Sequence, residues 1–225
     1  MAREAIDTLA IMLDHIDYTD NSVIARIYTR EYGLVSCIAK GVKKKLKKGT
    51  NKMSYFLPLN ICQVTFYYRA ERELHLLSEL HLIYYHQSLH TEIKKILYTS
   101  SLAEFLLCIL HEDSQPHLLF DFLKDKIIQL DRQNEHLIHL YVHILLNVCA
   151  YLGYKPNVLA WQDILETDYQ HLPTYLEDVY YNPEQSYPLT TEERKAILAA
   201  IEQFAKRYIH GFKPLQSKAI WEIIY

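Results

Sequence analysis

The hydrophobic pattern of the chain changes period near residue 82, and this change constrains the fold more than any other feature. Before it, short runs rich in β-branched and aromatic residues predict strands. These runs cover residues 8–16, 22–29, 34–39, 61–68 and 74–80. A turn-like stretch at 17–21 follows the first run, and Gly33 suits a tight hairpin that needs positive φ. Five short strands with one long internal loop predict a small antiparallel β-barrel of the OB type.

After residue 82 the apolar residues recur at helical spacing. This spacing predicts helices over residues 89–112, 116–130 and 134–152, and the third is apolar on most faces and should be central. Pro116 suits a first helical turn, and Gly153 is a typical C-cap. The fold class is therefore α+β, with an OB-like domain at residues 1–82 and an all-α domain at residues 83–225.

The last part of the helical domain is harder to interpret. Residues 157–189 contain three prolines and many aromatic residues, so we expect a short helix and an irregular or hairpin segment there. Thr190 or Thr191 should cap a helix that runs to Tyr208. Pro214 should begin a last short helix.

Charge is distributed unevenly along the chain. The formal net charge of the 225 residues is -3, but residues 1–80 carry a balance of +3 and the remainder -6. This asymmetry indicates separate roles for the two parts. No apolar run approaches the ~20 residues that span a bilayer, and the first residues do not resemble a signal peptide. We expect a cytoplasmic protein.

The lysine-rich segment, residues 40–52, contains 7 lysines and no acidic residue. Closely spaced lysines repel one another unless a polyanion binds them, and each phosphate contact releases a counterion. A solvated surface loop is the alternative interpretation. Because OB-type barrels bind strands with their loops and one sheet face, the position of this segment favours DNA binding. The predicted DNA-binding residues are Arg26, Arg30, Lys40, Lys43, Lys44, Lys45, Lys47, Lys48, Lys52 and Arg69.

Aromatic residues near this segment could stack on unpaired bases, although core packing is favoured for any one of them. They are Tyr28, Tyr32, Tyr55, Phe56, Phe66, Tyr67 and Tyr68.

The sequence contains few patterns that indicate a metal-binding or catalytic site. His136, His139 and His143 share one helix face, but no carboxylate or cysteine pattern completes a metal site. We therefore favour a polar helix face, or weak contacts with anions, over metal binding. The four cysteines are far apart and should be buried apolar side chains. The chain has no G-x-S-x-G, no Walker A loop and no G-x-G-x-x-G. We expect no metal, no cofactor and no catalysis.

Several segments, taken in order, resemble the bacterial recombination mediator family RecO. Family members share a T-x-E-x-G … A-K-G-basic … L-x-P-L pattern, which matches residues 29–33, residues 39–48 and, with its proline one place earlier, residues 57–59. Downstream, residues 152–156 look like the family's L-G-Y-x-P, and residues 211–217 look like its G-x-x-P-L-x-S. Many relatives carry four zinc-binding cysteines after the former motif. This chain has none there, so we predict a zinc-free variant in which aromatic packing replaces the metal.

The resemblance implies a protein that binds single- and double-stranded DNA, anneals complementary strands and, with RecR, helps RecA replace the single-stranded-DNA-binding protein. It also implies a bacterial protein associated with the nucleoid. Family members grip the acidic, apolar C-terminal tail of the single-stranded-DNA-binding protein through the helical domain. The candidate residues for that contact are Lys124, Lys126, Arg132, His139 and His143.

Two other function classes stay open. In one, the acidic helical domain is a protein-interaction adaptor and the lysine-rich segment binds no DNA. In the other, the chain is an unrecognised hydrolase, since a missing motif does not exclude catalysis.

Overall fold

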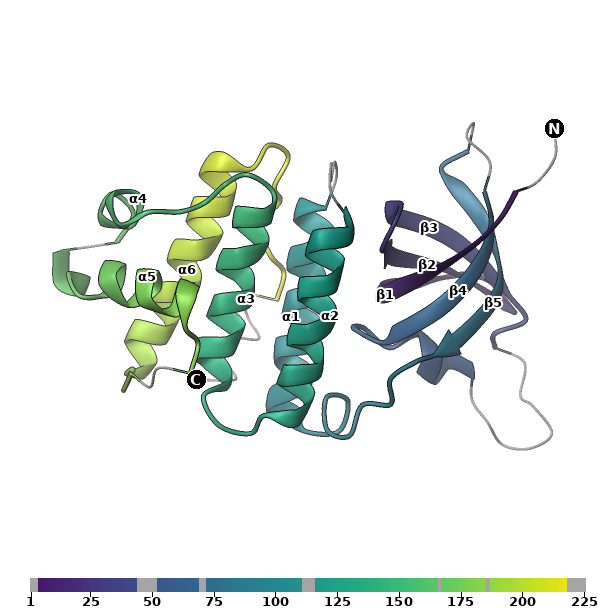
Figure 1. Ribbon diagram of the computed structural model, residues 1–225, viewed down its shortest axis with the longest axis horizontal. Helices are drawn as coiled ribbons and strands as arrows, with labels where there is room; N and C mark the ends of the chain where they lie inside the picture. The colour runs from purple at the N-terminus through teal and green to yellow at the C-terminus, as the bar shows by residue number, and fades with distance from the viewer. Residues whose placement is uncertain are drawn as a thin grey trace.

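A barrel of strands and a stack of helices make up the two ends of the molecule (Figure 1). The computed structural model describes residues 4–43, 52–68, 72–110, 116–165, 167–184 and 187–217. Strands occupy the first part of the chain and α-helices the rest, which confirms the predicted α+β class and the order of its two parts.

The barrel has the strand order β1-β2-β3-β5-β4 and is closed by pairing of β4 with β1. The strands are β1 (Glu4–Thr19), β2 (Ser22–Thr29), β3 (Gly33–Lys40), β4 (Ile61–Tyr68) and β5 (Leu74–Leu82). All neighbours are antiparallel except β3 and β5, which pair in parallel. This arrangement confirms the predicted five-stranded OB-like barrel, but the expectation that it is wholly antiparallel is wrong, because β3 and β5 pair in parallel.

The first strand is longer than predicted because it serves two neighbours. Its first half pairs with β4 and its second half pairs with β2, with a register shift between Met12 and Asp14. Asp17 and Thr19 still pair with β2, so the turn contains only Asp20 and Asn21. The hairpin predicted at Gly33 is confirmed, and its φ of 65° explains the glycine.

The helices form layers that lead away from the barrel. They are α1 (Ile93–Ile109), α2 (Pro116–Arg132), α3 (Leu137–Tyr151), α4 (Val158–Gln162), α5 (Leu172–Tyr181) and α6 (Thr191–Tyr208), with short 3-10 turns η1 (Lys52–Phe56) and η2 (Thr167–Tyr169). In Figure 1, α1 and α2 lie beside the barrel and α3 lies between them and the outer helices α5 and α6. Since most of α3 is buried, its predicted central place is confirmed.

Two sequence expectations need correction. The described part of residues 157–189 contains α4, η2 and α5 but no strand, so the hairpin alternative is wrong. Pro173 stands in the first turn of α5, where its missing N–H does not weaken the helix. The described start of the expected last helix, residues 214–217, has no regular structure and then a turn rather than a helix, and the remainder lies outside the described residues.

Apolar packing joins the barrel to the helices. One buried cluster fills the barrel interior, and a second runs through the helices and includes five barrel residues. These five are Ile11, Leu13, Tyr28, Leu59 and Ile61. The contact between the two parts is therefore continuous with the main core, and it holds the barrel in one position relative to α1 and α2.

Candidate nucleic-acid interface

The lysine-rich segment leaves the barrel at the end of β3. This strand begins at Gly33, close to Pro116 of α2, and ends at Lys40, roughly 23 Å further along at the usual rise of a strand. The segment therefore starts at the end of β3 that points away from α2. Lys40 and Lys52, its first and last residues, are exposed. Predicted site residues Lys44, Lys45, Lys47, Lys48 and Arg69 lie outside the described residues.

The first residues of the segment are tied to the β1–β2 hairpin. The backbone N–H of Val42 donates to the carbonyl of Asn21 at 3.0 Å. Lys43 forms an ion pair with Asp17, with 2.7 Å between Nζ and Oδ1. The carboxylate of Asp17 is largely exposed, so this contact orients Lys43 more than it stabilises the fold.

The structure places the two predicted arginines at the contact between barrel and helices. Arg30 donates from Nε and Nη2 to the two carboxylate oxygens of Asp121 on α2, at 3.0 and 2.7 Å. These hydrogen bonds lower the pKa of Asp121 and raise that of Arg30. Arg26 is paired with Asp14, with 2.7 Å between Nη2 and Oδ2. Neither arginine lies beside the lysine-rich segment.

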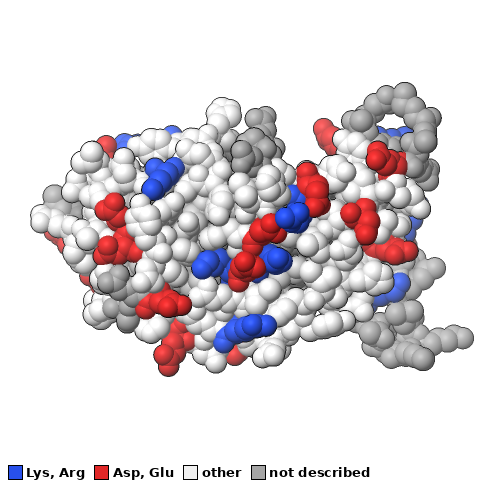
Figure 2. Space-filling view, viewed as in Figure 1, with Lys and Arg blue, Asp and Glu red and all other residues white. Residues whose placement is uncertain are grey.

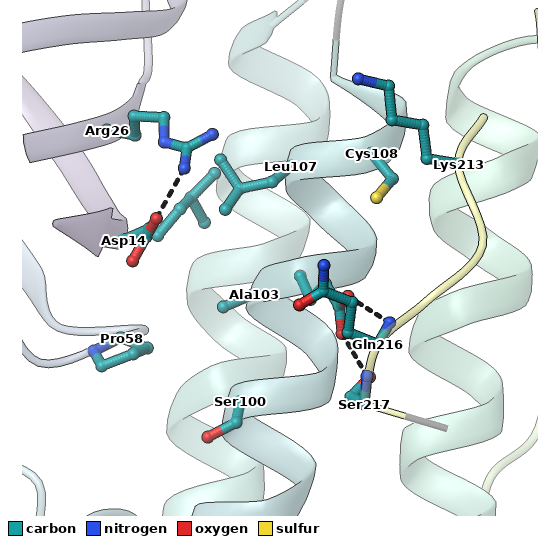
Figure 3. A pocket seen from close by; sticks show the side chains of 12 residues that line it. Asp14, Arg26, Pro58, Ser100, Ala103, Leu107, Cys108, Lys213, Gln216 and Ser217 are labelled. Carbon is teal, nitrogen blue, oxygen red and sulfur yellow. Dashed lines mark hydrogen bonds and ion pairs between the residues drawn. The ribbon is translucent and has the colours of Figure 1, made fainter. Parts of the chain in front are cut away.

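Arg26 lines a cleft between the barrel and the helices (Figure 3). The cleft is a cavity of about 720 Å³ with Arg26 on the barrel wall and Lys213 on the opposite wall. Glu104 of α1 accepts hydrogen bonds from the backbone N–H groups of Gln216 and Ser217, at 2.5 and 2.8 Å, which ties the C-terminal segment to α1. Acidic and basic side chains both line this cleft, so its charge does not favour a nucleic acid.

Core packing accounts for three of the seven aromatic candidates. Tyr28, Phe56 and Phe66 are buried, and the hydroxyl of Tyr28 donates to the carbonyl of Pro116 at 3.1 Å. Tyr32 is 47% exposed, and its ring centroid lies 6.1 Å from that of Tyr68. Both rings are held by aromatic neighbours and retain exposed surface. Tyr32 directly precedes Gly33, at the end of β3 opposite the lysine-rich segment, so the expectation that these rings lie near that segment is wrong.

The two candidate histidines of α3 are structural. His139 is 3% exposed and its Nδ1 lies 2.8 Å from the hydroxyl of Tyr175, while His143 is 6% exposed and its Nδ1 lies 3.0 Å from the carbonyl of Val179. Burial lowers the pKa of His139 to about 4 and also lowers that of His143. The expected polar face of α3 is therefore wrong at these positions, since both rings pack α5 against α3.

The basic candidates on α2 remain accessible. Lys124 lies 4.0 Å from a carboxylate oxygen of Asp121, Lys126 lies 6.0 Å from the ring centroid of Phe122, and Arg132 lies 5.7 Å from that of Tyr84. Figure 2 shows acidic and basic side chains interleaved where the barrel meets the helices. On that face the described residues form no purely basic patch.

A buried polar network that the sequence did not reveal positions the barrel. Asp131 of α2 is 1% exposed and accepts hydrogen bonds from the backbone N–H groups of Gln87, Ser88 and Leu89, at 2.8 to 3.1 Å. Burial by itself would raise the pKa of Asp131, but these donors and the hydroxyl of Tyr84 outweigh it and lower the pKa to about 2. The network therefore fixes the linker between β5 and α1.

Lys95 completes this network from α1. Its side chain is fully buried, and Nζ donates to the hydroxyl of Ser88, the carbonyl of Asp131 and Oδ1 of Asn134, at 2.6 to 2.9 Å. A lysine in an amphipathic helix is normally solvated, so no pattern in the sequence indicated this one.

Two further properties concern the described residues as a set. No group of three or more His, Cys, Asp or Glu side chains within them could hold a metal ion. No helix in the described ranges is long and apolar enough to cross a membrane.

Comparison with known proteins gives consistent matches along the chain. A family model described as "Recombination protein O N terminal" matches residues 1–86, and "Recombination protein O C terminal" matches residues 90–159. The chain is 24% identical to the DNA repair protein RecO of Flavobacterium johnsoniae and 26% identical to that of Christiangramia forsetii, in each case over 98% of this chain and 99% of the relative. The RecO of Porphyromonas gingivalis is 23% identical over 96% of this chain and 97% of the relative.

Proposed function

Because the chain belongs to the RecO family of DNA repair proteins, we propose that it is a non-enzymatic mediator of recombinational repair that binds and anneals DNA. The lysine-rich segment, set between β3 and η1 of an OB-like barrel, is the observation that carries this proposal. Its first and last lysines, Lys40 and Lys52, are exposed, and β3 ends at Lys40 on the side away from α2, so a DNA strand can approach this end of the barrel.

Annealing follows from the charge of this segment. Two complementary strands repel each other through their phosphates, and lysines that contact both strands offset this repulsion while counterions are released. Lysine ammonium groups contact phosphates without reading the base sequence, so the bases stay free to pair. Ring surface at Tyr32 and Tyr68 is available to unpaired bases only on a strand that runs along the barrel from the lysine-rich segment to the opposite end of β3. The chemistry requires no bond cleavage, which is why we infer binding without catalysis.

The partners that belong to this proposal are RecR, the tail of the single-stranded-DNA-binding protein and, indirectly, RecA. Lys124, Lys126 and Arg132 of α2 are the accessible cations for the acidic tail. We leave His139 and His143 out of this contact, since both are buried against α5. A protein that acts on chromosomal DNA in bacteria would work in the cytoplasm beside the nucleoid.

A salt titration combined with an annealing assay tests the proposal. We expect the affinity for single-stranded DNA to fall with salt on a linear log–log plot, and the slope to become smaller when lysines 43–48 are changed to alanine. The same variant should anneal complementary strands at least ten times more slowly. A matched control changes Lys195 and Lys206 of α6, both exposed and far along the chain from the barrel, to alanine.

Two results would contradict the proposal. One is a flat dependence of DNA affinity on salt, and the other is full annealing activity in the variant of lysines 43–48. Absent DNA binding, together with partner capture by the helical part alone, would instead support the protein-interaction adaptor.

A further inference from the structure

The last lysine of the lysine-rich segment belongs to a short helix that is held firmly against the barrel. Lys52 is both the last residue of the segment and the first residue of η1, and it is exposed. Phe56, at the other end of η1, is 3% exposed and packs in the barrel core. Since a 3-10 helix rises about 2 Å per residue, Lys52 lies roughly 8 Å from Phe56 along the helix axis. The position of Lys52 therefore depends on how η1 is held.

A buried asparagine binds two carbonyls of η1. Asn60 is 3% exposed, and its Nδ2 donates to the carbonyls of Ser54 and Tyr55 at 2.9 and 3.1 Å. A carbonyl only accepts hydrogen bonds, so the NH₂ end of this amide must face η1, and both of its N–H groups are used there. An alanine in place of Asn60 could make neither bond.

The backbone around Asn60 is itself fixed on β1. The N–H of Met12 donates to the carbonyl of Asn60 at 2.9 Å, and the N–H of Leu59 donates to the carbonyl of Met12 at 2.7 Å. Leu59 has a φ of 62°, a left-handed conformation that is unfavourable for a leucine. Leu59 is also fully buried, so hydrogen bonds and packing together hold this strained conformation. The side chain of Asn60 is therefore presented to η1 from a rigid support.

A second contact ties η1 to the part of β1 that also holds the start of the segment. Nδ1 of His15 lies 3.1 Å from the carbonyl of Phe56, and the two rings meet edge to face. Two residues further along β1, Asp17 forms the ion pair with Lys43. The helix that begins with Lys52 is thus anchored at the end of the barrel where Lys43 lies.

The charge of Lys52 is available to a polyanion. Lys43 is paired with Asp17, whereas Lys52 forms no ion pair with any residue that the structure describes. A cation whose backbone is already fixed loses less entropy when it contacts a phosphate than one on a chain that must first be ordered. The anchoring of η1 should therefore increase the contribution of Lys52 to binding.

We propose that Asn60 is a positioning residue for DNA binding, which holds η1 so that the ammonium of Lys52 contacts a phosphate of a bound single strand. This inference rests on the proposed function and extends it, since it assigns part of the DNA affinity to a buried amide that does not touch DNA. The alternative is that Asn60 only stabilises the barrel.

The salt dependence of binding to a single-stranded oligothymidine separates these two roles. The slope of log affinity against log salt changes by about 0.7 for each phosphate contact on a single strand. Asn60→Ala should make the slope shallower by about 0.7 and weaken binding at low salt by about threefold or more. A variant that is only less stable has a smaller folded fraction but an unchanged slope. Lys52→Ala should give the same change in slope, and the double variant should lose no more than either single variant.

Asn147→Ala is the matched control. Nδ2 of Asn147 also donates to two backbone carbonyls, those of His143 and Tyr180, at 2.9 and 3.1 Å, but in the helical part. This variant should be destabilised yet keep the wild-type slope and affinity. His15→Ala gives a second way to release η1 if Asn60→Ala does not fold, because His15 is only partly buried, and it too should make the slope shallower. Urea denaturation establishes which variants are folded under the conditions of the assay.

Three outcomes would overturn the proposal. They are a wild-type slope in folded Asn60→Ala, or in His15→Ala where the former does not fold; changes in slope that add in the double variant with Lys52→Ala; and an equal change in slope in Asn147→Ala. Each of these leaves the proposed function intact, because the wild type still binds DNA. A wild-type chain that binds no DNA overturns the proposed function and this inference together.

Discussion

A buried carboxylate costs free energy unless several donors surround it, and Asp131 meets this condition. Three consecutive backbone N–H groups of the linker and the hydroxyl of Tyr84 point at its two oxygens. The linker has no regular hydrogen-bonded structure of its own at residues 83–87, so this one side chain satisfies donors that would otherwise be buried without acceptors.

Asp131→Asn should therefore destabilise the protein strongly. The substitution removes the charge and places an amide NH₂ where one oxygen now accepts from backbone N–H groups, which should cost about 2–4 kcal/mol. Urea denaturation at pH 7 measures this change in the free energy of unfolding. Asp125→Asn, on the exposed side of the same helix, is the matched control and should change stability by less than about 0.5 kcal/mol. Equal stability of the two variants would contradict the role given to Asp131.

Two histidines should make the protein sensitive to mild acid. The side chain of His86 is 2% exposed, and burial, with a smaller contribution from His90, lowers its pKa to about 4, while His139 is buried with a pKa of about 4. Both pKa values lie below the unfolded value, so the unfolded chain binds more protons and stability is lost as pH falls from about 6.5 towards 4. We expect each histidine to remove about 2 kcal/mol by pH 5.

Urea denaturation at pH 7.5, 6 and 5 measures this loss. His139→Asn should be less stable than the wild type at pH 7.5 and should lose less on acidification. His210→Asn is a suitable control, since that histidine is exposed. A wild-type free energy of unfolding that stays constant from pH 7.5 to 5 would rule out neutral, buried histidines.

At the scale of single elements, the sequence predicted those strands, turns and helix starts that depend only on residues close together in the chain. The bounds of β2 and β4 agree with their alternating segments, and Gly33 and Pro116 stand at the turn and the helix start where their backbone preferences place them. The length of β1 could not be predicted, because it depends on pairing with two different strands. Helical spacing placed His139 and His143 on one face but could not show that α5 covers that face.

The same distinction applies to the candidate site. The lysine-rich segment was found because its composition alone indicates a polyanion contact. Arg30 was assigned to DNA on charge, whereas its partner Asp121 is 91 residues away in the chain and only the fold brings the two together. The Asp131 network was missed for the same reason, since it combines residues of the linker with residues of α1 and α2.

At the start of α6 the sequence prediction can be tested with one residue. The hydroxyl of Thr190 accepts from the N–H of Glu193, and the carboxylate of Glu193 accepts from the N–H of Thr190, which is a capping box. Thr190→Ala removes the first of these bonds and should lower the free energy of unfolding by about 1 kcal/mol. Thr191→Ala, one position on, should change it by less than half as much. Chemical denaturation of both variants decides between Thr190 and Thr191 as the cap.

At the scale of the whole molecule, we propose that residues 1–82 and 83–225 are two domains in sequence that unfold as one unit. The larger apolar cluster includes barrel residues and helix residues together. Asp131 fixes the linker, and Arg30 orients the barrel on α2 through Asp121. The Arg30–Asp121 pair is partly exposed and screened by solvent, so the shared core and the linker network carry the coupling.

Two probes that report on different parts should therefore change at the same urea concentration. Both tryptophans follow residue 82 in the sequence, and Trp161 is buried against Phe204 of α6, so its fluorescence reports on the helical domain. Cys37 and Cys62 are buried in the barrel with pKa values raised to about 12 by burial, so a thiol reagent modifies them only when the barrel opens. Pulsed labelling followed by mass spectrometry gives the barrel transition.

Coincident midpoints are expected because unfolding either domain alone would expose the apolar surface that both share. In Asp131→Asn the linker loses its buried acceptor, so the two midpoints should separate if the network contributes to the coupling. In the wild type, the contrary result is labelling of the barrel cysteines at a urea concentration well below the fluorescence change. That result would show that the barrel unfolds independently of the helical domain.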